Sequence, residues 1–216
     1  MNGVEIEIDG EGIAVRFDRM LPVVSSAVVG GGFALARAVV NVHVPKSFRC
    51  DDAERVLGDF VRRRAIASPY VGLLTAAWTE NAEVVTATAD GLTATAVVTV
   101  GLSNAIGAGR SPAGAWTPST INAIVLVEAA PEPVALVNLI ITATEAKTLA
   151  LAEAGVRAAD GGLASGTSTD AVVVAATGRG PRCRFGGPVS ELGAVVARAV
   201  REALGTGVDR WLEEHR

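Results

Sequence analysis

Short apolar segments rich in valine, alanine and threonine recur along this chain and constrain its fold more than any other feature. In the first third, glycine, aspartate or proline separates each segment from the next. This pattern is typical of β-strands, in which successive side chains point to opposite faces of a sheet. The predicted strands are VEIEI (4–8), GIAVRF (12–17), PVVSSAVV (22–29), ARAVVNVHVP (36–45), YVGLLTAAW (70–78), AEVVTATAD (82–90), LTATAVVTVGL (92–102), STINAIVLVEA (119–129) and AVVVAATG (171–178).

Three longer segments have the spacing of helices. Their apolar residues recur three and four positions apart, which places them on one face of a helix. Prolines stand near the start of two of these segments, and glycine follows one of them, as is usual at helix termini. The predicted helices are residues 50–66, 131–155 and 188–207.

The order of these elements predicts the fold class. Strands come in consecutive groups interrupted by a few helices, rather than in regular strand–helix alternation, and this order favours an α+β fold. The sequence therefore predicts largely antiparallel or mixed β-sheets covered by a few helices, that is, an α/β sandwich. Because no long polar linker divides the chain, we expect a single domain over residues 1–216.

Charge and composition argue against several classes of partner and location. The net charge is −4, and acidic residues balance the arginines at 62–64, so no nucleic-acid partner is expected. Two cysteines do not make a disulfide framework and fit a reducing compartment. The N-terminus lacks a signal-peptide pattern, and no charge-free apolar run approaches about 18 residues. We therefore predict a cytoplasmic protein without membrane contact.

Histidine is scarce, which argues against a histidine-rich metal site. Only His43 and His215 are present, and fraying is expected at His215 because it is the penultimate residue. His43 shares one strand face with Asn41, where both side chains can bind a ligand or, equally, face solvent on an edge strand. Gly31 lies in a GGG break that permits close backbone approach to a ligand, although a simple turn is the alternative.

The helix predicted over 131–155 carries an unusual polar stripe. Asn138, Thr142 and Glu145 lie on one side, whereas Lys147 lies off that stripe. Because the helix is otherwise apolar nearly all round, we expect it to be buried. A buried carboxylate suits general acid–base chemistry, and an internal hydrogen-bond network is an equal alternative.

Two loops are rich in small polar residues. The segment SGTSTD (165–170) offers the hydroxyls of Ser165, Thr167 and Ser168, backbone N–H groups, and the Asp170 carboxylate just before a strand. Such groups suit an oxyanion or amide site, and a plain turn that leads into the strand is the alternative. The segment GLSNAIGAG (101–109) is similar in kind, with Asn104 as its candidate binding residue.

Several of these segments together resemble the adenosylcobinamide amidohydrolases, the CbiZ family. The resemblance rests on INAIVLVEAAPEPVALVNLIITATEAKTLAL (121–151), SGTSTDAVVVAATG (165–178) and FGGPVSELGAVVARAVREAL (185–204). It covers nearly the whole chain. One departure is WTPSTIN, where Ser119 stands in place of the glycine expected in the family.

The resemblance implies a reaction and a substrate. The expected reaction is hydrolysis of the amide that joins the aminopropanol arm to the corrin side chain of adenosylcobinamide, in corrinoid salvage for cobalamin synthesis. The expected products are adenosylcobyric acid and 1-amino-2-propanol. We expect no metal or other resident cofactor, since cobalt enters only with the corrinoid substrate. The oligomeric state stays open, with a homodimer as one option.

The predicted site combines these residues. Direct attack by water is the first hypothesis, with Glu145 or Asp170 as base and Lys147 or loop N–H groups stabilising the oxyanion. A Thr or Ser nucleophile from 165–169, or Ser25 or Ser26, is the second. The predicted catalytic residues are Glu145, Lys147 and Asp170, and the predicted substrate-binding residues are Gly31, Asn41, His43, Asn104, Asn122, Thr142, Ser165, Thr167 and Ser168.

Three other functions remain open from the sequence. The protein could bind corrinoids without hydrolysing them, and product formation would discriminate that case. It could hydrolyse a different amide, as the change at Ser119 permits. It could also be a self-processing hydrolase cleaved between Gly166 and Thr167, which intact mass would test.

Overall fold

A computed structural model describes residues 1–114 and 119–216 of the chain. In these residues, eight strands form one mixed sheet with the order β4-β3-β2-β11-β8-β6-β5, and β1 pairs with β2. The pairing is antiparallel except for β3 with β4 and β8 with β11. The strands are β1 (Val4–Ile8), β2 (Gly12–Ser25), β3 (Gly32–His43), β4 (Tyr70–Thr75), β5 (Glu83–Ala89), β6 (Leu92–Val100), β8 (Ile121–Val127) and β11 (Ala171–Ala176).

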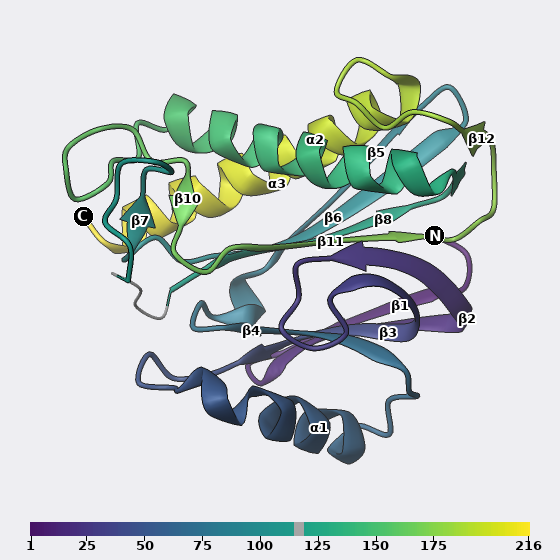
Figure 1. Ribbon diagram of the computed structural model, residues 1–216, viewed down its shortest axis with the longest axis horizontal. Coiled ribbons are helices and arrows are strands. Elements are labelled where there is room, and N and C mark those ends of the chain that lie inside the picture. Colours follow the sequence, from purple (N-terminus) through teal and green to yellow (C-terminus); the bar gives the residue numbers. More distant parts are fainter. Residues whose placement is uncertain (115–118) are drawn as a thin grey trace.

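The sheet folds on itself, so that its two halves pack face to face (Figure 1). Strand alternation builds this arrangement, because neighbouring residues of one strand enter different cores. In β8, Ile124 joins β2 residues such as Val15 in the core between the halves. Its neighbour Val125 instead packs toward the long helices. The halves are joined where β2 pairs with β11, with Val24 opposite Val174.

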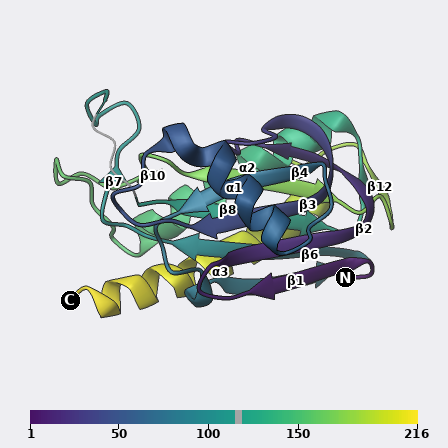
Figure 2. The same cartoon turned by 90° about the horizontal axis from the view of Figure 1, so that it is seen from below.

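Helices cover both outer faces of this folded sheet. Helix α3 (Glu191–Glu214) lies on β5 and β6, and α2 (Pro133–Glu153) lies on α3 and β11. On the opposite side, α1 (Ala53–Arg63) packs on β3 and β4, as Figure 2 shows from that side. The result is a helix–sheet–sheet–helix sandwich, which confirms the predicted α+β fold with a mixed sheet. Short elements complete it: η1 (Cys50–Asp52), η2 (Thr79–Asn81), β7 (Ala105–Ile106), β9 (Ala130–Pro131), β10 (Gly166–Thr167) and β12 (Arg182–Cys183).

Among the element boundaries that differ from the sequence prediction, two have a clear structural reason. The strands expected at 12–17 and 22–29 form the single long strand β2, whose register against β3 shifts between Arg16 and Leu21. Such an irregularity lets one strand bend and keep its pairing. Helix α3 runs beyond Gly207 to Glu214. A Cβ on Gly207 would lie 2.7 Å from Val100 Cγ2, so the glycine permits close packing of helix on sheet.

Helix α2 is apolar on nearly all sides. Among the described residues, it is the one helix long and apolar enough to cross a membrane by length and composition. Half of that window is buried inside the protein, and the core helix of a soluble protein passes the same test. One face of α2 packs on α3 and the sheet, whereas Val134, Val137, Ile141 and Leu149 are exposed on the other, so the expectation that the helix is buried holds for one face only.

Candidate functional site

The core between the two sheet halves ends in a buried network of polar side chains. Asn122 donates from Nδ2 to Asn41 Oδ1 at 2.8 Å and to the Leu74 carbonyl oxygen at 2.9 Å. Asn41 donates in turn to Thr99 Oγ1 at 3.1 Å, and Thr120 donates to Asn122 Oδ1 at 3.2 Å. The four side chains are nearly inaccessible to solvent. This network fixes the ends of β3, β6 and β8 relative to one another.

The Asp170 carboxylate accepts four hydrogen bonds close to this network. Its carboxylate forms an ion pair with Lys147 and accepts from Thr167 Oγ1. Backbone N–H groups of Thr167 and Ile121 donate to the two carboxylate oxygens at 3.0 and 3.1 Å. A carboxylate offers about four lone-pair positions, so its capacity is filled. Asp170 therefore holds the lysine ammonium and the threonine hydroxyl in place.

The two polar loops predicted from the sequence lie side by side. Strand β10 pairs antiparallel with β7, so that Thr167 lies opposite Ala105. Side chains extend this pairing: Asn104 Nδ2 donates to Ser168 Oγ at 2.7 Å, and the Ala108 N–H donates to Ser165 Oγ at 2.9 Å. Residues of both loops line a shallow pocket next to the Asp170 cluster. The expectation that the loops meet at one site is therefore supported by the geometry.

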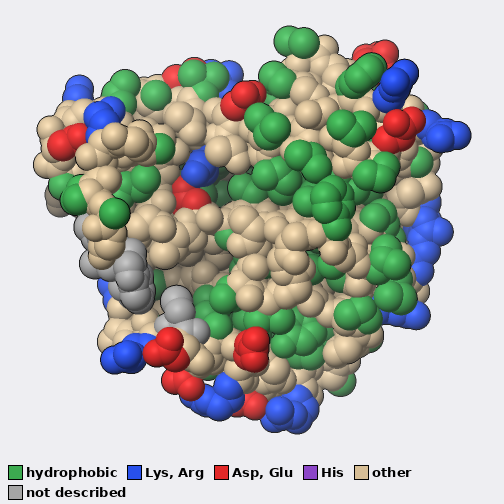
Figure 3. Space-filling model, in the orientation of Figure 1, with side chains coloured by type: hydrophobic (Ala, Val, Ile, Leu, Met, Phe, Trp, Pro, Cys, Tyr) green, Lys and Arg blue, Asp and Glu red, His purple; other side chains and the backbone are tan. Residues whose placement is uncertain are grey.

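The surface is hollowed in the same region. Figure 3 shows a hollow beneath α2, beside the β7 and β10 loops, with hydrophobic side chains along its border. The side chains of Lys147 and Asp170 keep 8% and 10% of their surface exposed. They are thus shielded from bulk water but still reachable, which strengthens any electrostatic effect on a bound group.

Helix α2 turns Lys147, and not Glu145, toward this cluster. Lys147 is buried, whereas Glu145 is exposed. Two positions along a helix rotate a side chain by about 200°, so the two residues point in nearly opposite directions. The predicted buried stripe is wrong, because Asn138 is only half-buried and Thr142 alone is fully buried. The Thr142 hydroxyl donates to the Gly186 carbonyl at 2.8 Å and anchors the segment before α3.

The remaining predicted residues have local partners. His43 Nδ1 lies 2.9 Å from the Ala77 carbonyl oxygen, and its ring stacks on Trp78. A Cβ on Gly31 would lie 2.4 Å from the Ala27 carbonyl oxygen, so the turn itself requires this glycine. Ser119 is buried, and its carbonyl accepts from Thr169 Oγ1 at 2.9 Å. The rest of the WTP stretch before it lies outside the described residues.

Gly166 lies against the Lys147–Asp170 pair and gives a direct test of it. A Cβ at this position would lie 2.2 Å from Asp170 Oδ2 and 2.6 Å from Lys147 Nζ. Gly166→Ala is therefore expected to displace the pair. For the amide hydrolysis that the resemblance implies, turnover should fall by about 10²-fold, since a shift of about 1 Å has this effect in active sites. Steady-state kinetics checks this, with Gly58→Ala as control because nothing lies within 4 Å of its added Cβ. Equal turnover in both variants would contradict the placement of the Lys147–Asp170 pair in the active site.

A second pocket was missed by the sequence analysis. It is lined by Trp78, Trp211 and His215, together with Ser119. The one available signal was the rarity of tryptophan, with 3 in 216 residues. In the part of the chain that is described, no group of three His, Cys, Asp or Glu residues is arranged to hold a metal ion.

Fold and site together define a class of protein: an α/β sandwich with a lysine–aspartate–threonine cluster at the end of its inner core. The sequence model of the CbiZ family, adenosylcobinamide amidohydrolase, matches residues 1–216. The chain belongs to this family.

Comparisons with individual proteins agree with this assignment. An adenosylcobinamide amidohydrolase of Methanosarcina mazei is 33% identical over 193 residues, covering 85% of this chain and 88% of the relative. One of Halobacterium salinarum is 29% identical over 191 residues, covering 83% and 77%. A crystal structure of a Pyrococcus horikoshii protein superposes with a TM-score of 0.50 at 13% identity, covering 95% of this chain and 83% of that one. This last likeness concerns the fold alone.

Proposed function

We propose that this protein hydrolyses the amide that joins the aminopropanol arm to the corrin side chain of adenosylcobinamide. The products are adenosylcobyric acid and 1-amino-2-propanol, and the reaction serves corrinoid salvage for cobalamin synthesis. The substrate follows from the family and from the relatives of that name. The observation that supports amide hydrolysis is the nearly buried cluster in which Asp170 binds the Lys147 ammonium and the Thr167 hydroxyl.

The cluster favours the threonine hydroxyl as the nucleophile. All acceptor positions of Asp170 are filled, which leaves no free position to bind a separate attacking water, whereas the Thr167 hydroxyl already donates to it. Thr167 Oγ1 attacks the amide carbon while its proton passes to Asp170. The Lys147 ammonium stabilises the negative charge that develops on the amide oxygen. Glu145 has no part in this scheme, because it faces solvent.

The reaction closes in two steps. The tetrahedral intermediate collapses with cleavage of the C–N bond, and the proton held by Asp170 moves to the leaving nitrogen, so that 1-amino-2-propanol departs as a neutral amine. The acyl group remains on Thr167 as an ester. Water then attacks this ester, gives its proton through Asp170 to the threonine oxygen, and releases the corrinoid carboxylic acid.

Some of the remaining predicted residues suit binding roles, and others support the site. Asn104, Ser165 and Ser168 lie on the paired loops beside the cluster and suit the amide side chains of a corrin. Asn41 and Asn122 support the site through the buried network. We assign no resident metal or cofactor, and cobalt enters as part of the substrate. We place the enzyme in the cytoplasm, without a nucleic-acid or membrane partner.

Incubation of the purified protein with adenosylcobinamide tests the proposal. Mass spectrometry is expected to detect adenosylcobyric acid and 1-amino-2-propanol in equal amounts. Tight binding of adenosylcobinamide without either product would overturn the hydrolase and leave a corrinoid-binding protein. Cleavage of a different amide would be detected in the same spectra as a product of another mass.

A further inference from the structure

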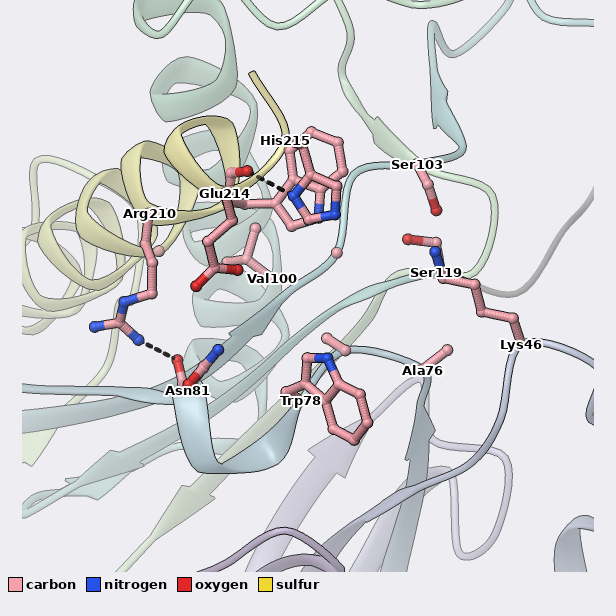
Figure 4. A pocket seen from close by; sticks show the side chains of 14 residues that line it. Lys46, Ala76, Trp78, Asn81, Val100, Ser103, Ser119, Arg210, Glu214 and His215 are labelled. Carbon is pink, nitrogen blue, oxygen red and sulfur yellow. Dashed lines mark hydrogen bonds between the residues drawn. The ribbon is translucent and has the colours of Figure 1, made fainter.

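The pocket beside the catalytic cluster has aromatic walls. It lies between the loop after β4, the residues just before β8 and the last turns of α3 (Figure 4). It is a small cavity of about 100 Å³. Its lining includes Trp78, Trp211 and His215, with Lys46, Asn81 and Ser103 as polar neighbours.

One wall is an indole fixed in orientation. Trp78 is 59% exposed, an unusual position for a tryptophan without a partner protein. His43 stacks on it at 4.7 Å between ring centroids and 13° between planes. The His43 ring is in turn held by the Ala77 carbonyl oxygen at 2.9 Å. One indole face is thus covered by His43, and the largely exposed Trp78 side chain lines the pocket.

The opposite wall comes from the C-terminal end of α3. His215 stacks on Trp211 at 4.1 Å and 10°, and His215 Nδ1 lies 2.8 Å from the Trp211 carbonyl oxygen. Figure 4 shows His215 across the pocket from Trp78. Arg210, on the same helix, forms an ion pair with Glu83 and donates to the Asn81 carbonyl at 2.8 Å, which fastens this end of the helix to β5 and η2. Both walls are therefore held in place before any ligand arrives.

Aromatic residues are concentrated here against the composition of the chain. Only 4% of the residues are aromatic, and two of the three tryptophans line this one pocket. Aromatic surfaces bind planar rings by stacking, and polar groups at the edge satisfy ring nitrogens and exocyclic amines. Aromatic walls around a small cavity favour a single flat ring such as a purine over a puckered macrocycle with many side arms.

We propose that this pocket binds a purine, and that it holds the adenine of the adenosyl ligand while the Thr167 cluster acts on the amide. This assignment of the substrate rests on the proposed function. The two sites are connected through Ser119, which lines the pocket and whose carbonyl oxygen lies 3.3 Å from Thr167 Oγ1. A single substrate can therefore contact both, and the adenosyl group positions the scissile amide.

Binding of 5′-deoxyadenosine, measured by calorimetry, tests the pocket without turnover. The wild-type protein is expected to bind this nucleoside saturably, and Trp78→Ala and Trp211→Ala are expected to bind it about tenfold more weakly. Phe185→Ala is the matched control, because Phe185 is similarly exposed at 62% but lies before the N-terminal end of α3. No binding by the wild type, or equal weakening in the control, would overturn the proposal.

Kinetics with two corrinoids separates this proposal from the proposed function. Trp78→Ala is expected to raise KM for adenosylcobinamide about tenfold with kcat unchanged, and to leave KM for cyanocobinamide within about twofold of wild type. Equal changes in KM for both corrinoids would overturn the adenine assignment. Hydrolysis without nucleoside binding would refute the pocket and keep the hydrolase. Nucleoside binding that depends on Trp78, without hydrolysis of either corrinoid, would support the pocket and refute the hydrolase.

Discussion

Replacing Asp170 by asparagine is expected to lower the turnover of adenosylcobinamide by about 10²–10⁴-fold. The amide cannot accept the proton of the Thr167 hydroxyl, and its N–H groups oppose the donors that surround this position. Removing one partner of a nearly buried ion pair leaves Lys147 uncompensated, which costs about 3–5 kcal/mol. The melting temperature is therefore expected to fall by roughly 10 °C. Product formation by mass spectrometry and thermal melts measure the two effects.

Two further variants separate catalysis from stability at this position. Glu145→Gln removes a carboxylate from the exposed side of the same helix and is expected to leave turnover within about twofold of wild type. Asp170→Asn combined with Lys147→Met removes the uncompensated charge, so the melting temperature should recover while the turnover stays as low as in Asp170→Asn. Loss of turnover in Glu145→Gln with normal turnover in Asp170→Asn would refute the assignment of the base.

Thr167→Val is expected to lower turnover by at least about 10³-fold, because valine has the shape of threonine without the nucleophilic hydroxyl. The backbone N–H of residue 167 still donates to Asp170, so the loop keeps its main support. Thr167→Ser restores a hydroxyl and is expected to retain measurable turnover. Rapid-quench mass spectrometry of the wild-type protein should detect the corrinoid acyl group as an ester on Thr167.

The same experiment decides between the two mechanisms. If Thr167→Val turns over at nearly the wild-type rate and no acyl-protein is found, a water molecule attacks the amide directly. Ser165→Ala is the matched control, since Ser165 lies in the same loop as Thr167 but its hydroxyl accepts from the Ala108 N–H of the neighbouring loop, outside the Asp170 cluster. Its turnover is expected to change by less than about tenfold.

The sequence by itself determined the layers of this protein. Nearly continuous apolar runs, as in β8, predict strands buried on both faces, and such strands need a covering layer on each side. The clustering of hydroxyls, amides and Asp170 likewise marked the two glycine-containing loops that the structure brings together. These features are local, because strand period and turn chemistry depend on neighbouring residues only.

Only the tertiary structure decided which side chains face one another. Helix α2 is apolar nearly all round, so its own sequence gives no inward face, and packing on α3 and β11 turns Lys147 inward and Glu145 to solvent. Pairing of β7 with β10 joins two loops about 60 residues apart in sequence. Helix α3 packs closely on β6 at Gly207, and its last turns place Trp211 and His215 in the pocket that Trp78 also lines. These contacts join distant parts of the chain, and no local pattern encodes them.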